Sequence, residues 1–296
     1  MPRLTLYALL ALGGSCWGLT IPLTKISVST GHQPFGLIFW QLALSAIILA
    51  TILLVRRKPL FPAGASLSLL IFVGLVGTNI PNSFSYWAAA NLPAGVLAVV
   101  IALVPMFALP MAIALGRETV DPKRMFGVLL GAAAVILIVG PPTSLPESAS
   151  VVFVFIAMIA PFCYGLEGNV VAIRGTGILD PMQLLFGASI VSFIFNLPIM
   201  LATSQFVNPL VAFGAAEMAI VANAGLHVIA YSLYLWLVGR AGAVFTSQIS
   251  YLVTGTAVLW SMVLLSETYS VWIWTALALM LVGIALVQPR SADASQ

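Results

Sequence analysis

Polar side chains recur at helical spacing inside two long apolar segments of this sequence. Residues 65–89 place four of them at i, i+3, i+4 and i+7: Asn79, Asn82, Ser83 and Tyr86. Residues 211–238 place three at i, i+4 and i+7: His227, Tyr231 and Tyr234. On a helix each set shares one face. Such faces either form hydrogen bonds between helices, worth about 0.6 kcal/mol each in a membrane, or line a hydrated cavity, because hydrocarbon offers no polar partner. For the two aligned sets we favour the cavity.

Three charged or titratable residues inside apolar segments are candidates for binding or gating. His227 could bind a carboxylate or relay a proton near neutral pH, or donate as a neutral ring to a nearby carbonyl. Glu167 could receive an amino group or gate the site, and helix-end snorkelling or pairing with Arg174 explains it equally well. Lys25 is either a gate charge or a lysine that snorkels to the interface. Glu118 and Glu267 are expected to stabilise the turns before the helices that follow them.

Aromatic and amide side chains complete the set of cavity candidates. They are Trp17, Tyr164, Gln248 and Tyr251. Aromatic faces near helix centres can stack on a flat substrate or hold a cation. Few Lys or Arg residues lie in the segment centres, which argues against a phosphorylated substrate. A zwitterion with an apolar side chain fits better.

The composition requires a lipid environment around these residues. Of 296 residues, 61% are hydrophobic and 6% charged, with mean hydropathy +1.14, whereas a soluble domain has about 25% charged residues. Cys16 and Cys163 lie in apolar segments, so a disulfide framework is not expected. No basic cluster suggests nucleic-acid binding.

The apolar segments predict an all-α integral membrane protein. Ten transmembrane helices are expected at 4–27, 34–55, 65–89, 93–116, 123–140, 150–173, 181–202, 211–238, 241–265 and 271–288. This threading places ten of the eleven Lys and Arg residues on one side and only Lys25 on the other. The positive-inside rule then puts both termini in the cytoplasm.

The two halves of the chain resemble each other. Cys16-Trp17-Gly18 recurs as Cys163-Tyr164-Gly165 at an offset of 147, and Glu118-Thr119 recurs as Glu267-Thr268 at 149. We therefore expect two five-helix repeats, residues 1–145 and 146–290, followed by a short cytoplasmic tail, 291–296. An odd number of spans per repeat inverts the second copy, which suits alternating access. Helix interruptions near a midplane site are expected at five prolines: Pro22, Pro81, Pro105, Pro110 and Pro161.

These features resemble the EamA group of the drug/metabolite transporter superfamily. The resemblance lies in the five-plus-five organisation, Trp17-Gly18, Lys25, and the strings Gly116-Arg117-Glu118 and Leu265-Ser266-Glu267. Within the group the chain is most similar to bacterial aromatic amino acid exporters of the YddG type. The resemblance implies the drug/metabolite transporter fold, an inner-membrane location, and a central cavity lined by helices one, three, four, six, eight and nine.

The sequence thus predicts a secondary-type transporter that exports small amphipathic metabolites, aromatic or hydrophobic amino acids first, by alternating access. The alternative is a broad exporter of lipophilic cations or drugs, and more remote ones are a channel, a scramblase or an intramembrane enzyme. Catalytic signatures such as HExxH and GxGD are absent from the sequence, so no enzyme activity is expected. We expect no cofactor and no metal. The expected partners are a small-molecule substrate and membrane lipids, with no nucleic acid; the chain is compatible with a monomer.

Overall fold

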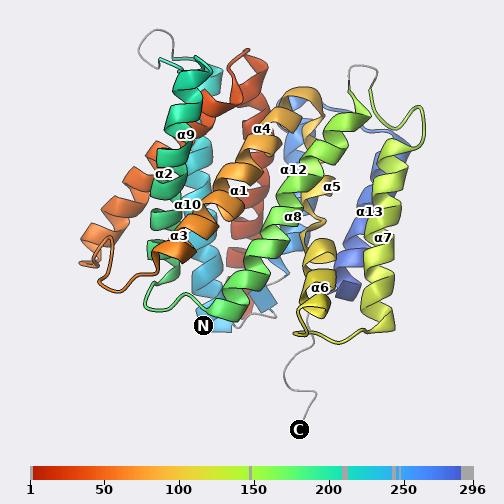
Figure 1. Ribbon diagram of the computed structural model, residues 1–296. Helices are drawn as coiled ribbons and strands as arrows, with labels where there is room; N and C mark the ends of the chain where they lie inside the picture. Colours follow the sequence, from red (N-terminus) through yellow and green to blue (C-terminus); the bar gives the residue numbers. More distant parts are fainter. Residues whose placement is uncertain (1–2, 147–148, 209–212, 242–244, 247, 288–296) are drawn as a thin grey trace.

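The computed structural model describes residues 3–146, 149–208, 213–241, 245–246 and 248–287, and every regular element in them is a helix (Figure 1). The elements are α1 (Arg3–Ser29), α2 (Pro34–Val55), α3 (Leu67–Gly74), η1 (Leu75–Asn79), α4 (Ile80–Asn91), α5 (Ala94–Ile101), α6 (Val104–Ala114), α7 (Pro122–Val139), α8 (Val151–Arg174), α9 (Pro181–Ala202), α10 (Ala215–Ala241), α12 (Ile249–Leu265) and α13 (Val271–Val287). The tail 291–296 lies outside the described residues.

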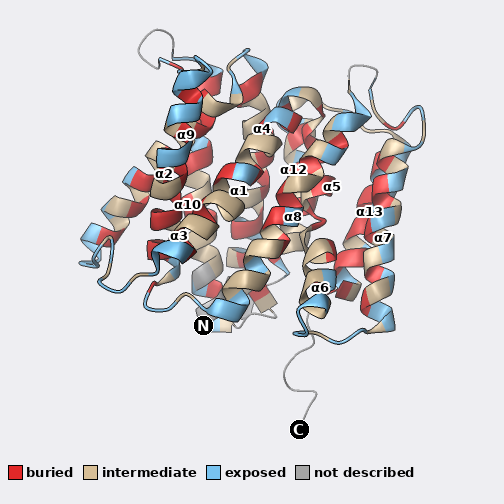
Figure 2. Ribbon diagram, in the orientation of Figure 1, coloured by how far each residue is buried: buried red, intermediate tan, exposed pale blue. Residues whose placement is uncertain are grey.

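In the described part of the chain, eight helical stretches are long and apolar enough to cross a membrane, counting α3–η1–α4 and α5–α6 as one stretch each. Two shorter apolar helices, α12 and α13, have 17 residues each. Large apolar side chains point outward from the helices: Ile136 of α7 is 67% exposed and Val263 of α12 is 70% exposed. Figure 2 shows that exposed residues also gather at many helix ends and in the connecting loops. The chain is therefore a multi-pass membrane protein.

Two of the five expected proline interruptions coincide with a change in helix geometry. The π-helical turn η1 comes directly before Ile80-Pro81, and the chain leaves regular helix at Ala102 and Leu103, just before Pro105. Proline removes a backbone donor and disturbs the preceding turn, which accounts for both irregularities. Pro22, Pro110 and Pro161 lie inside continuing helices, so the prediction of interruptions there was wrong.

The helices pack as recurring pairs. α1 packs on α10 and α12, whereas α8 packs on α4 and α6. α2 packs on α9, and α7 packs on α13. The largest buried cluster includes most of α5 and the inner faces of α7 and α13, with Ala94, Val96, Ala134 and Met280 fully buried.

Close helix approach depends on glycines, among them Gly18 and Gly165. A Cβ at Gly18 of α1 would overlap the Thr256 hydroxyl and lie 2.9 Å from the Ala257 nitrogen of α12. A Cβ at Gly165 of α8 would lie 3.0 Å from the Ala108 nitrogen of α6. Small residues let membrane helices approach to backbone contact, where dispersion and weak polar contacts hold them together.

The N-terminus of α9 is fixed by a capping box. The Asp180 carboxylate accepts from the Gln183 backbone nitrogen at 2.9 Å, and Lys58 donates to its other oxygen at 2.5 Å. The Gln183 side chain accepts in return from the Asp180 nitrogen. Burial alone would raise the Asp180 pKa, but the bonds from Lys58, Gln183 and Met182 outweigh it and hold that pKa below its usual value.

We expect Asp180→Ala to lower the free energy of unfolding by about 1 kcal/mol at neutral pH, because a helix cap is lost. The charged cap stabilises the fold above the ordinary aspartate pKa of about 3.9, and that contribution is lost as pH falls through the lowered value. Thermal unfolding in detergent between pH 3 and 7 measures both. Asp180→Asn keeps a capping oxygen, so it should retain much of the cap and lose its pH dependence. Equal acid sensitivity in wild type and Asp180→Asn would contradict this assignment.

Candidate functional site

An aromatic cluster joins α1 to α10 and brings four of the predicted site residues together. The Trp17 ring meets three rings edge-on, with centroid distances of 5.9 Å to His227, 6.5 Å to Tyr231 and 6.0 Å to Tyr234. His227 and Tyr231 stack with their centroids 6.4 Å apart. The i, i+4, i+7 spacing on α10 therefore forms one face directed at a single residue of α1.

The polar groups of this cluster have no hydrogen-bond partner among the described residues. Within the described part of the chain, no hydrogen bond engages the His227 ring or the hydroxyls of Tyr231 and Tyr234, although all three side chains are partly buried. One turn from His227, Asn223 donates to the Thr24 hydroxyl at 2.9 Å and locks α10 against α1. Polar groups in an apolar interior require partners. Packed aromatic rings whose imidazole and hydroxyl groups have no described hydrogen-bond partner are suited to bind a flat ligand that carries polar groups.

Glu167 of α8 lies against η1. A Cβ at Gly77 would overlap its carboxylate, so the absence of a side chain at Gly77 makes the space that the carboxylate occupies. Tyr164, one turn earlier on α8, and Tyr231 of α10 are both within electrostatic reach of this charge. The carboxylate therefore faces the interior that the aromatic cluster also borders.

Lys25 binds a helix end. Its ammonium donates to the carbonyl oxygens of Ala89 at 2.7 Å and Ala90 at 3.4 Å, at the C-terminus of α4. Cations stabilise that end of a helix, where free carbonyls carry partial negative charge.

Glu267 holds the other side of the same turn. Its carboxylate accepts from the backbone nitrogens of Ala94 at 2.9 Å and Gly95 at 3.3 Å, and from the Tyr269 hydroxyl at 2.5 Å. The bond from Tyr269 lies in the turn before α13, where a stabilising role for Glu267 was expected, and the carboxylate also reaches across to the N-terminus of α5. Glu118 does bind the following helix, through Arg124 at 2.7 Å.

The polar set on the third predicted span makes contacts between helices. Asn79 donates to the Ser192 carbonyl of α9 at 3.0 Å, and the Tyr86 hydroxyl donates to Gln41 of α2 at 2.6 Å. Ser83 bonds to the Asn79 carbonyl of its own helix, and Asn82 is half-buried. Tyr86 is only 2% exposed. The structure does not bring these four residues into contact with the Trp17 cluster.

The remaining candidates lie apart from the cluster. Gln248 and Tyr251 line a groove of about 440 Å³ together with Tyr7, Leu10 and Ala11 of α1. Tyr164 is half-buried on α8, one turn before Glu167.

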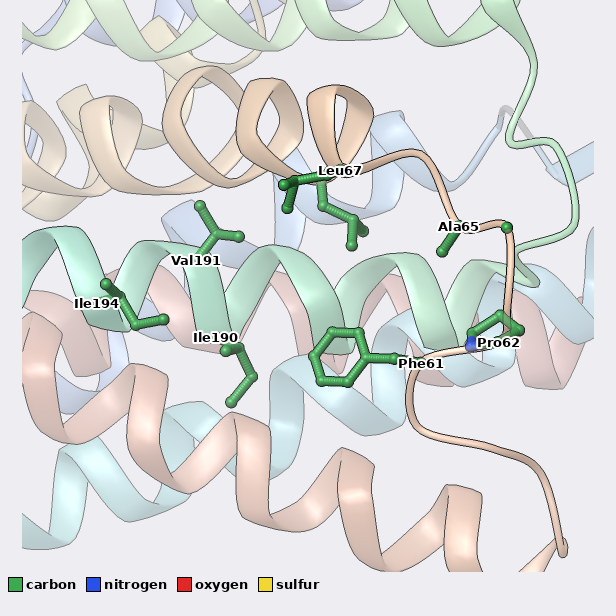
Figure 3. Close-up of a pocket in the computed structure, with 9 residues that line it drawn as sticks. Phe61, Pro62, Ala65, Leu67, Ile190, Val191 and Ile194 are labelled. Carbon is green, nitrogen blue, oxygen red and sulfur yellow. The ribbon is translucent and has the colours of Figure 1, made fainter.

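A second groove, of about 380 Å³, lies between α3 and α9 (Figure 3). Its lining is apolar, with Leu67 of α3 and Ile194 of α9 strongly exposed. A lipid chain suits it better than a polar metabolite. In the described ranges, no group of three or more His, Cys, Asp or Glu side chains could hold a metal ion.

Residues 4–140 match the EamA-like transporter family. The matched residues make up slightly less than half of the chain and are similar to an EamA-like transporter domain. The family is described as one of transporters. The residues that match this family include Trp17, Lys25 and Gly77, whereas Glu167, His227 and Glu267 lie beyond the matched residues.

Solved structures extend the comparison to the whole chain. One of 17 matching chains, titled only "Crystal structure of protein", aligns with a TM-score of 0.63 over 96% of each chain at 16% identity. This similarity shows a shared fold. No curated protein matches the chain.

Gly77 is the residue of the site that the sequence analysis missed. Its signal was available in Gly77-Thr78-Asn79-Ile80-Pro81, where a glycine stands one turn before a proline in an apolar segment. The partner, Glu167, is 90 positions away, and only the fold brings the two together.

Proposed function

We propose that this protein is a secondary-type transporter that exports small amphipathic metabolites, with aromatic or hydrophobic amino acids as the first substrate class. It works by alternating access between two inverted five-helix repeats, residues 1–145 and 146–290. Both termini are cytoplasmic and the membrane is the bacterial inner membrane. The observation that carries the proposal is the aromatic cluster, because it is built by one helix from each repeat.

The contacts between helices support the inverted repeat. Gly18 approaches the backbone of Ala257, and Gly165 approaches the backbone of Ala108. Gly165 is the position equivalent to Gly18 at the offset of 147 between the two halves of the chain, and Ala257 is the position equivalent to Ala108 at the offset of 149. Each repeat therefore inserts its first helix against the fourth helix of the other repeat. α1 on α10 and α8 on α4 repeat this exchange for first and third helices. A pair of units related this way has two conformations of similar energy, open to opposite faces.

The residues around the interior favour an aromatic zwitterion. Trp17 and the α10 rings can hold a flat side chain, and edge-to-face aromatic pairs add about 0.5–1.5 kcal/mol beyond burial. The imidazole and two hydroxyls supply donors for a carboxylate. Glu167 supplies a negative charge for an amino group. The same carboxylate favours the second candidate function, export of lipophilic cations.

Transport of labelled phenylalanine, tyrosine and tryptophan into proteoliposomes, with and without a proton gradient, tests the proposal. We expect saturable uptake of all three, and lipophilic cations compete strongly only if the second candidate function holds. Indifference to all three amino acids refutes the substrate class.

His227→Ala is expected to lower aromatic amino acid transport about tenfold, because a ring stacked on Tyr231 and packed against Trp17 is lost. His32→Ala is the matched control, since it removes the other of the two histidines. His32 lies between α1 and α2, and its ring bonds at 2.8 Å to Glu217 in the first turn of α10. Size-exclusion profiles verify that both variants fold. Equal transport by His227→Ala and wild type would remove the cluster from the binding site.

A further inference from the structure

Glu167 differs from four other carboxylates of the structure, which all have a hydrogen-bond donor. Asp180, Glu118, Glu217 and Glu267 each have a basic or backbone donor within 3.0 Å. Within the described ranges, the Glu167 carboxylate accepts no hydrogen bond and has no ion pair. It lies 16 positions into the 24-residue helix α8, within the apolar stretch Val151–Arg174. A carboxylate at this depth is costly unless it is neutralised or given a partner.

The surrounding helices fix the position of the Glu167 carboxylate but give it no hydrogen bond among the described residues. Asn169, on the next half-turn of α8, bonds to the carbonyls of Ala108 and Gly165 and fixes α8 against α6. On the other side, the π-helical turn η1 presents Gly77. π-helical turns are rare and occur often at functional sites. The geometry provides a fixed acceptor beside an open backbone position.

Among the residues that the structure describes, no cation faces this carboxylate. On α8 the neighbouring titratable groups are Cys163 and Tyr164, and on α10 they are Tyr231 and the His227 ring stacked on it. The sequences of η1, α5 and α6, which pack on α8, contain no titratable side chain, and Tyr86 of α4 is bonded to Gln41. The partner that the carboxylate requires must therefore arrive from outside.

We infer that Glu167 is the cation subsite of the transport cavity, where a protonated amine of the cargo and a proton bind in turn. This inference rests on the proposed function and adds its energy coupling. When the cargo's ammonium leaves, the carboxylate takes up one proton, because an unpaired charge in the low-dielectric interior is unfavourable. The next cargo amine displaces that proton. Outward movement of one amine thus accompanies inward movement of one proton.

Three ligands that differ in their charged groups test the subsite: phenylalanine, phenethylamine without the carboxylate, and 3-phenylpropanoate without the amine. Binding is measured by tryptophan fluorescence on purified full-length protein. Glu167→Gln is expected to weaken phenylalanine and phenethylamine about 10- to 100-fold, as for loss of a charged hydrogen bond. Binding of 3-phenylpropanoate should be unchanged. Glu167→Asp should retain part of the preference for amines.

Gly77→Ala is the second variant, because it leaves the charge in place and displaces the carboxylate. It should weaken amine binding while 3-phenylpropanoate binds as before. The control is Glu118→Gln, which removes a carboxylate paired with Arg124 at a helix end and should leave all three ligands unaffected. In proteoliposomes, Glu167→Gln should still exchange phenylalanine across the membrane but no longer respond to a pH gradient.

These experiments distinguish failure of the proposed transport function from failure of the Glu167 subsite alone. If wild type binds none of the three ligands, the proposed function fails and the subsite fails with it. If wild type binds them and Glu167→Gln weakens all three equally, or none, the subsite is overturned while the proposed function stands. A pH gradient that drives Glu167→Gln as strongly as wild type also overturns it.

Discussion

Gly18→Val is expected to prevent stable assembly of the helix bundle, lowering its stability by about 3 kcal/mol, at the upper end of the usual cost of overpacking. A Cβ at this position would overlap the Thr256 hydroxyl and lie 2.9 Å from both the Ala257 nitrogen and the Val253 carbonyl oxygen. Two of these atoms belong to the α12 backbone, which cannot rotate away. α1 and α12 would have to separate, and α1 would keep only its packing on α10 in the second half of the chain.

The matched control is Gly255→Val on α12 itself, since no atom lies within 4 Å of a Cβ built there. It changes the same residue type in the same helix pair and should leave the monodisperse peak after heating in detergent unchanged. Gly165→Val should repeat the defect of Gly18→Val, because the Ala108 nitrogen lies 3.0 Å away. Normal stability in Gly18→Val would mean that α1 and α12 are not in backbone contact.

Helix positions were largely predictable from the sequence. The predicted segments 34–55 and 181–202 coincide with α2 and α9, and most other ends agree within a few residues. Long apolar stretches broken by Gly, Pro and charge leave little freedom, since each backbone group in hydrocarbon must pair within its own helix. The ninth predicted segment began at 241, whereas Ala241 ends α10 and α12 begins at Ile249; residues 242–244 and 247 lie outside the described residues.

The contacts of the polar residues were less predictable. The spacing of Asn79 and Tyr86 defines a shared face but does not say which helix covers it, and α9 and α2 supply Ser192 and Gln41. The α10 set has the same spacing and meets an aromatic ring instead. Periodicity fixes direction within a helix, whereas the partner depends on packing between distant segments. Lys25 illustrates this limit, because its ammonium binds carbonyls 64 and 65 positions away.

Lys25→Met and Glu267→Gln are each expected to loosen the turn between α4 and α5 and to increase exposure of Leu92 about tenfold. Lys25 donates to the last carbonyls of α4, and Glu267 accepts from the first backbone amides of α5. The two charged side chains therefore form hydrogen bonds on either side of residues 91–93. They are also within electrostatic reach of each other. Hydrogen bonds to charged groups contribute about 1.5–3 kcal/mol, and a tenfold change in population corresponds to about 1.4 kcal/mol.

The reporter is Leu92→Cys, because Leu92 lies within this turn and is only 1% exposed. Cys16 and Cys163 are first replaced by alanine, and labelling by a membrane-impermeant maleimide is timed in proteoliposomes. Each variant should speed labelling from the proposed outer face. Glu118→Gln at the opposite end of the bundle is the control and should not. Lys25 holds this turn from within the first proposed repeat, and Glu267 reaches it from the second. We therefore expect the turn to stay closed only while the two proposed repeats remain together at that face. If neither variant changed the labelling rate, the two charges would be helix caps with no part in closing that face.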